Sequence, residues 1–179
     1  MSKKIIILIA FLCLFFGFQL HAKEAHREHG AHVHGAGTLG IAFEQTKGVI
    51  DFKIPSESIF GFEHAAKSTA DQKKMNDGLQ KLENKISEMI VFDSALKCQI
   101  SKVKIEVVKE KNAENHSETI ASFNVLCERS PVGTKLKFFV QKFFPQIKDL
   151  DVTFLAEETQ ASVEAKKDGI ILDLTTFRK

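Results

Sequence analysis

Apolar and polar residues alternate along most of the chain after residue 31, and this period of two predicts β-strands. The alternating segments are residues 38–43, 49–54, 99–108, 119–128, 151–156, 161–165 and 170–174. Thr46-Lys47-Gly48 separates the first two segments, and Asp168-Gly169 precedes the last, so turns are expected at both places. Pro55 should end the second strand, because proline has no N–H to donate to a neighbouring strand.

Two other segments carry apolar residues at intervals of three and four, the spacing of an amphipathic helix. The first follows Ser68 or Thr69, either of which can cap it, and its apolar positions are Met75, Leu79, Leu82, Ile86, Met89 and Ile90. The second has apolar positions at Leu136, Phe139, Val140 and Phe143 and stops at Pro145. The predicted order is ββα-ββα-βββ. It corresponds to an α+β fold, an antiparallel sheet of hairpins with two amphipathic helices on one face.

The first 22 residues have the pattern of a secretion signal. Lys3 and Lys4 precede an apolar run of about 14 residues, which is short of the roughly 20 that a membrane-spanning helix needs. Leu20-His21-Ala22 offers a cleavage site of the small-residue type. The expected organisation is a signal peptide at 1–22, a flexible His-rich arm at 23–31 and a single domain at 32–179, located in the periplasm. An uncleaved membrane anchor is the alternative.

The leader carries two lysines and no acidic residue, so its removal lowers the formal net charge from +2 to zero. A neutral chain lacks the basic surface of a nucleic-acid-binding protein. Cys98 and Cys127 are the cysteines that remain, and a hairpin of residues 99–108 with 119–128 brings them opposite each other. In an oxidising compartment this predicts a disulfide, with thiolate metal ligands as the alternative. A shift of the apolar phase between Ile100 and Val103 predicts a bulge.

Histidines gather near the expected mature N-terminus as His26, His29, His32 and His34, in the pattern H-x2-H-x2-H-x-H. Imidazole nitrogen binds Zn²⁺, and also Cu²⁺ and Ni²⁺. In an extended segment the side chains of His32 and His34 lie on one face about 6.6 Å apart. Both rings can then reach one ion at about 2.0–2.1 Å, with His26 and His29 completing a tetrahedron. A disordered arm that captures metal without selectivity is the alternative.

Two further histidines stand alone. Spacing by itself favours a structural role for His64, and His116, between Glu114 and Glu118, is expected to be a solvated loop residue. The chain has no GxSxG or HExxH string and no glycine-rich loop between a strand and a helix, so an enzyme is not predicted.

Several strings resemble the ZrgA-like family of bacterial zinc-uptake proteins over about residues 30–175. They are Gly30-Ala31-His32-Val33-His34-Gly35, Phe60-Gly61-Phe62-Glu63-His64-Ala65, Leu96-Lys97-Cys98, Phe123-Asn124-Val125-Leu126-Cys127 and Phe143-Phe144-Pro145-Gln146-Ile147. The resemblance implies a periplasmic protein that binds zinc and assists its uptake beside a membrane zinc transporter. It also implies that His64 joins His32 and His34 as a metal ligand, with His29, Glu63 or water completing the site.

The chain departs from the family in one respect. Members often carry a long insert rich in His, Asp and Glu between the matched cysteines, whereas residues 109–118 hold only His116 with three glutamates. We therefore expect a low metal capacity and a protein that captures or delivers zinc. An envelope structural or interaction module whose arm scavenges metal is the alternative. The oligomeric state stays open, a metal-linked dimer included.

Overall fold

The computed structural model describes residues 34–109 and 116–177. The predicted signal peptide and arm, the ligands His26, His29 and His32, and the expected tip of the second hairpin lie outside these residues.

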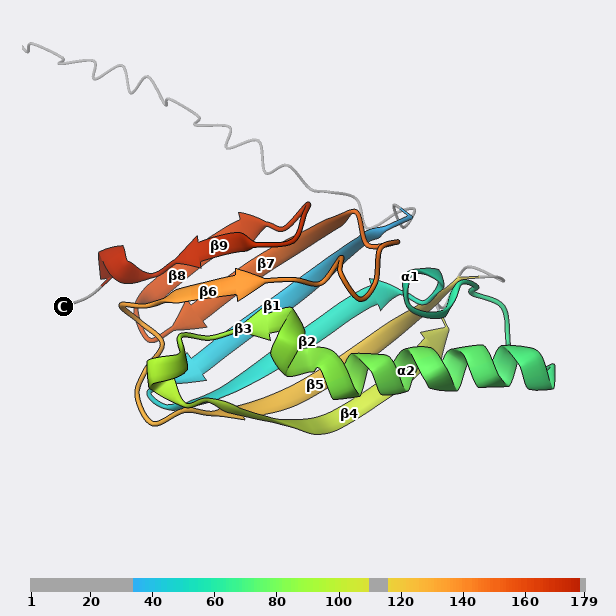
Figure 1. The fold of residues 1–179 in the computed structure, drawn as a ribbon, viewed down its shortest axis with the longest axis horizontal. Coiled ribbons are helices and arrows are strands. Elements are labelled where there is room, and N and C mark those ends of the chain that lie inside the picture. The colour runs from blue at the N-terminus through green and yellow to red at the C-terminus, as the bar shows by residue number, and fades with distance from the viewer. Residues whose placement is uncertain (1–33, 110–115, 178–179) are drawn as a thin grey trace, which may run out of the picture. The chain divides into compact units, whose positions relative to one another are not determined.

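The larger of two sheets has six strands (Figure 1). Its order is β4-β5-β2-β1-β7-β8, and the strands are β1 (Ala36–Glu44), β2 (Lys47–Pro55), β4 (Gln99–Lys109), β5 (Ser117–Leu126), β7 (Asp149–Ala156) and β8 (Thr159–Glu164). Neighbouring strands are antiparallel except β1 and β7, which run parallel. The mostly antiparallel sheet and the hairpins β1–β2, β4–β5 and β7–β8 are therefore confirmed, whereas the last predicted strand belongs to a second sheet and the parallel pair β1–β7 was not predicted.

The smaller sheet has the order β3-β6-β9, formed by β3 (Ile90–Val91), β6 (Lys135–Phe138) and β9 (Ile170–Asp173). The helices are α1 (Glu57–Phe60) and α2 (Thr69–Met89), with 3-10 turns at Ser94–Leu96 and Thr175–Phe177. Figure 1 shows α2 lying across one face of the six-stranded sheet, on the same side as β6 and β9. The described residues thus form two layers.

The predicted helix at residues 136–143 is wrong. Leu136 and Phe138 are fully buried, whereas Lys135 and Lys137 are exposed, which is the alternation of a strand. Both edges of β6 are paired, with β3 on one side and β9 on the other. The backbone hydrogen bonds of these two pairings decide the conformation, so the ββα-ββα-βββ order does not hold.

The first hairpin turns earlier than predicted. β1 ends at Glu44 and β2 begins at Lys47, so the turn consists of Gln45 and Thr46, with Gln45 in the left-handed region at φ 55°. Gly48 lies within β2, where a Cβ atom would come within 2.8 Å of the Phe43 ring. This glycine is required for close packing rather than for the turn.

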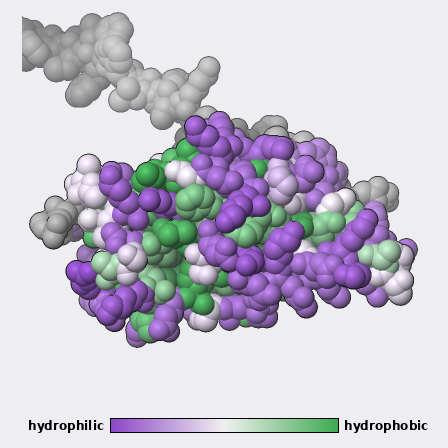
Figure 2. All heavy atoms as spheres, in the orientation of Figure 1, coloured by the Kyte–Doolittle hydropathy of each residue, from purple (hydrophilic) through white to green (hydrophobic). Residues whose placement is uncertain are grey.

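The core fills the space between α2, the small sheet and one face of the large sheet. Alternate residues of three strands point into it: Leu39, Ile41 and Phe43 of β1, Ile50, Phe52 and Ile54 of β2, and Leu150, Val152 and Phe154 of β7. Of the two predicted caps, Ser68 is the one that caps α2, because its hydroxyl accepts a hydrogen bond from the N–H of Asp71 at 3.0 Å. The outward side of α2 is mostly hydrophilic (Figure 2). Neither α2 nor any other helix within residues 34–109 and 116–177 has the length and apolarity to cross a membrane.

The β4–β5 hairpin agrees with two predictions. Cys98 and Cys127 form a disulfide. The pairing register shifts between Lys102 and Lys104, which leaves Val103 as the extra residue of a bulge. Val103 is 57% exposed and lies on an edge strand, so the bulge interrupts an edge that could otherwise pair with another chain.

Candidate metal centre

Four chain segments meet at one end of the six-stranded sheet. β1 begins there, β2 ends there, and β5 and β7 begin there, because β2 is antiparallel to β1 and β5 while β7 is parallel to β1. Two backbone hydrogen bonds join the segments beyond the strands: Ser56 N–H to the Ser117 carbonyl at 2.9 Å and Lys148 N–H to the Gly35 carbonyl at 2.7 Å. This end of the sheet holds His34, His116, Glu57 and Glu63 close together in space.

Gly35 fixes the place of His34. Its φ is 79°, a backbone conformation that residues other than glycine rarely adopt. A Cβ atom at this position would lie 2.7 Å from the carbonyl oxygen of Gln146. Its own carbonyl accepts hydrogen bonds from the N–H groups of Lys148 and Asp149. The backbone on the C-terminal side of His34 is therefore held against the start of β7.

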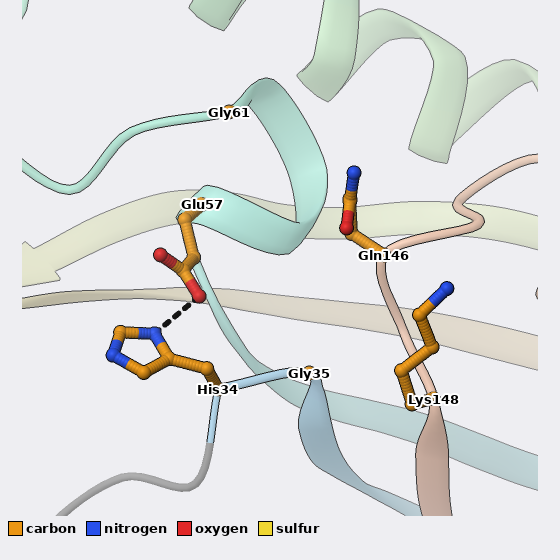
Figure 3. A pocket seen from close by; sticks show the side chains of 6 residues that line it. All are labelled: His34, Gly35, Glu57, Gly61, Gln146 and Lys148. Carbon is orange, nitrogen blue, oxygen red and sulfur yellow. Dashed lines mark hydrogen bonds and ion pairs between the residues drawn. The ribbon is translucent and has the colours of Figure 1, made fainter.

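The single turn α1 brings Glu57 to His34. It follows directly after β2 and ends at Gly61, whose φ is 91° and whose N–H donates to the Glu57 carbonyl at 2.8 Å. The Nδ1 atom of His34 and the Oε1 atom of Glu57 form a hydrogen bond (Figure 3). The His34 side chain is 65% exposed and that of Glu57 33% exposed. This pair is therefore open to solvent.

A second pair of the same kind lies beside the first. The Nδ1 atom of His116 is 2.5 Å from the Oε2 atom of Glu63. The Glu63 side chain is only 8% exposed. The main-chain carbonyl oxygen of Glu63 accepts a hydrogen bond from the Ser117 hydroxyl at 3.0 Å. His116 lies in a loop with 43% of its side chain exposed, as predicted for a solvated loop residue, but the bond of its ring to Glu63 was not predicted.

The imidazole rings of His34 and His116 lie close together. Their centroids are 6.2 Å apart, and their planes are inclined at 49°. Each ring uses Nδ1 for its carboxylate, so Nε2 is the nitrogen on the other side of the ring. Figure 3 shows this for His34, whose second nitrogen is turned away from Glu57.

His64 has other contacts. Its ring stacks on Phe62 with centroids 4.6 Å apart and planes inclined at 14°, and its Nδ1 atom is 3.1 Å from the Ala65 carbonyl. Of the ligands expected from the sequence, His34 and Glu63 therefore lie in the two bonded pairs, whereas His64 is exposed and packs on an aromatic neighbour.

A polar pocket of about 340 Å³ opens beside His34. It is lined by His34, Gly35, Glu57, Gly61, Gln146 and Lys148 (Figure 3). The ammonium group of Lys148 donates to the Pro145 carbonyl at 2.5 Å. Across the part of the chain that the structure describes, no three His, Cys, Asp or Glu side chains converge closely enough to hold a metal ion. At this end of the sheet the described residues bring together two imidazoles, each hydrogen-bonded to a carboxylate.

The sequence did not predict a site role for His116, because its partner Glu63 is distant in the chain. Glu63 follows β2 and His116 precedes β5, so they meet only through the β2–β5 pairing, in which Pro55 lies opposite Glu118. The one available signal was that both residues flank strand ends, and it becomes specific only when those two strands are known to be neighbours.

Comparison with known proteins gives one family. The description "ZrgA family zinc uptake protein" matches residues 31–174, a span that contains both histidine–glutamate pairs. The match confirms the resemblance inferred from the strings around His34 and His64. No curated protein matches the chain.

Proposed function

Because the chain belongs to the ZrgA family of zinc uptake proteins, we propose that it binds Zn²⁺ in the periplasm and captures or delivers it in support of uptake. The signal-peptide pattern of residues 1–22 supports export, and a membrane zinc transporter is the natural recipient of the ion. The proposal assigns the chain no catalytic reaction. Zinc is cargo here rather than a resident cofactor.

The observation that carries the proposal is the His34–Glu57 pair. Metal-binding histidines usually donate their second ring N–H to a carboxylate or carbonyl, which orients the ring and raises its basicity. His34 has such a partner, lies within a family string and is well exposed. The ligand set proposed from the sequence is His32, His34 and His64, with His29, His26 or Glu63 as additional ligands.

The solvent exposure of His34 favours a role in zinc transfer over one in zinc storage. Structural zinc sites are closed by four protein ligands, whereas sites that exchange a ligand keep a position open. The His34 side chain is 65% exposed, so an ion bound there can be approached by water or by a partner protein. An accessible site of this kind suits a protein that receives and releases its metal.

The test is zinc affinity as a function of pH, measured on the purified protein by competition with a chromophoric chelator. Protons compete with zinc for imidazole, whose ordinary pKa is about 6.5, so affinity should fall by roughly tenfold for each histidine ligand between pH 7.5 and 5.5. Parallel titrations with Cu²⁺ and Ni²⁺ rank the metals. Constant affinity over this pH range would reject a site dominated by histidine.

A growth experiment separates this function from the envelope-module alternative. Cells that carry His32→Ala, His34→Ala and His64→Ala together should grow poorly when zinc is scarce and normally when it is added. Normal growth in both media would favour the alternative, in which metal capture is incidental.

A further inference from the structure

We infer that the Nε2 atoms of His34 and His116 bind one zinc ion between them, while Glu57 and Glu63 position the two rings without touching the ion. The inference rests on the proposed function and deepens it, because it names the atoms of the site and adds a ligand from the residue that precedes β5. It also moves Glu63 from a candidate ligand to a positioning residue.

Proton placement gives the first step. An ionised carboxylate can only accept hydrogen bonds, so the Nδ1 atom that faces it must carry a proton. When the ring is neutral, the lone pair is therefore on Nε2. Both His34 and His116 are set in this tautomer by their glutamates. The chain thus presents two metal-binding nitrogens of the same kind, each backed by a carboxylate as in many zinc sites.

Distance gives the second step. Two imidazoles that share one zinc ion through nitrogens at about 2.1 Å have ring centroids about 5 to 6 Å apart. The centroids of His34 and His116 are 6.2 Å apart, just beyond that range. The shared site therefore requires a rotation of the exposed His34 side chain that brings both Nε2 atoms to a common ion.

The unequal surroundings of the two rings give the third step. His116 is bonded to a buried carboxylate, and the next residue, Ser117, is tied to both Glu63 and the backbone of Ser56. His34 lies at the open end, where its side chain is 65% exposed. His116 can therefore act as the fixed ligand and His34 as the adjustable one. The two imidazole nitrogens fill two of the four positions around a zinc ion, so water would complete the shell and the substrate is a partly hydrated divalent cation.

The decisive comparison uses zinc affinity at pH 7.5 in variants of the full chain. His116→Ala and His34→Ala should each weaken binding by roughly tenfold or more. Asn124→Ala, an exposed change on β5, the strand that follows His116, should leave binding unchanged. Circular dichroism confirms that each variant folds. A loss confined to His64→Ala, with His116→Ala at the wild-type value, would overturn the inference in favour of the set that includes His64.

Glu63→Gln tests the positioning role, because it keeps the shape of the side chain and removes its charge. Zinc affinity should fall by roughly tenfold, as for other residues behind a metal ligand. Glu128→Gln is the matched control, since Glu128 forms an exposed ion pair with Lys97 just beyond the far end of β5. Nitrogen-15 NMR of the His116 ring gives a readout that a purely structural role would not change: the Nδ1–H tautomer should dominate in wild type and lose population in Glu63→Gln.

The same spectra locate the ion. Zinc should shift the Nε2 resonances of His34 and His116 together, at the same metal equivalents. If zinc binds the chain and moves neither or only one of these resonances, the shared site is wrong while the proposed function stands. If no zinc binds to the wild-type chain at all, the proposed function fails as well.

Discussion

Hydrogen bonds at the end of β9 stabilise the ionised form of one carboxyl group, that of Asp173. Asp173 accepts hydrogen bonds from both the hydroxyl and the N–H of Thr175, and Lys135 lies 3.0 Å from its second carboxylate oxygen. These contacts, the Thr175 hydroxyl first, lower the pKa of Asp173 from 3.8 to about 2. A carboxylate whose pKa is depressed by folding stabilises the fold above its unfolded pKa and loses that contribution as the pH falls through its folded pKa.

Thr175→Val should raise the pKa of Asp173 partway toward 3.8, because it removes the hydroxyl donor and keeps the backbone donor and Lys135. The pH at which Asp173 stops contributing to stability should rise with it, within the interval from about 2 to 3.8. Carbon-13 NMR titration of the Asp173 carboxyl measures the shift. Thr38→Val, on β1 of the other sheet, is the control. An Asp173 pKa near 2 in Thr175→Val would show that the hydroxyl is not the main cause.

The sequence predicts some residues of the candidate site but not the contacts between them. His34 could be identified from its place in a histidine-rich string, and Glu63 from the family string that includes it. The bond between Glu63 and His116 could not, because it joins residues 53 positions apart. Local sequence also could not show that His64 would stack on Phe62, since one rotation of either side chain decides that contact.

At the scale of elements, α1 and α2 depend on a close approach at Gly78. A Cβ atom on Gly78 would lie 2.8 Å from the Ile59 carbonyl oxygen and 3.1 Å from the Cβ atom of Phe60. The contact is with backbone, which cannot move aside without displacing α1. Because α1 carries Glu57, the fit of the two helices also sets the position of one histidine–glutamate pair.

Gly78→Ala should therefore destabilise the protein by about 1–3 kcal/mol, the usual cost of overpacking. Helix propensity alone predicts the opposite sign, a gain of about 1 kcal/mol from replacing glycine in a helix. Chemical denaturation measures the change. Ser87→Ala on the exposed side of α2 is the matched control and should alter stability by less than about 0.5 kcal/mol. A stabilised Gly78→Ala would mean that α1 shifts at little cost.

The strands and helices that could be predicted are those whose own residues show a clear apolar period and a clear start or end. Strong alternation and Pro55 marked β2, and Ser68 with its apolar stripe marked α2. β6 failed because its few apolar residues fit a period of two or of three and four equally well, and only its pairing with β3 and β9 resolves the choice.

At the scale of the whole molecule, the disulfide and the candidate metal centre lie at opposite ends of the same strand. Cys127 follows the last residue of β5, and His116 precedes the first. The crosslink spans 29 positions in sequence. Closing a loop of that length is worth about 3 to 4 kcal/mol through the entropy of the unfolded chain.

Replacing both cysteines by alanine should lower the free energy of unfolding by about 3 kcal/mol. Zinc affinity should stay near the wild-type value wherever the variant is folded, because the crosslink is remote from the histidine pairs. Denaturant unfolding and chelator competition on the same samples measure the two effects, with reduced wild-type protein as the control. A parallel loss of zinc affinity in the folded variant would show that the two ends of β5 are coupled.

The overall topology was beyond sequence reasoning. Nothing local to β1 reveals that β7 is its neighbour, because Ala36 pairs with Asp149 across most of the chain. The pairing of β1 with β7 is favoured because it allows α2 and the small sheet to cover the apolar faces of β1, β2 and β7 together.

That parallel pairing has a kinetic consequence. β1 is the first strand of the large sheet along the chain, and one of its two edges stays open until residues 149–156 arrive. Pairings between segments so distant in sequence slow folding, because a long loop must close before the contacts stabilise it. The large sheet therefore should remain incomplete until β7, near the C-terminal end of the sequence, has been synthesised.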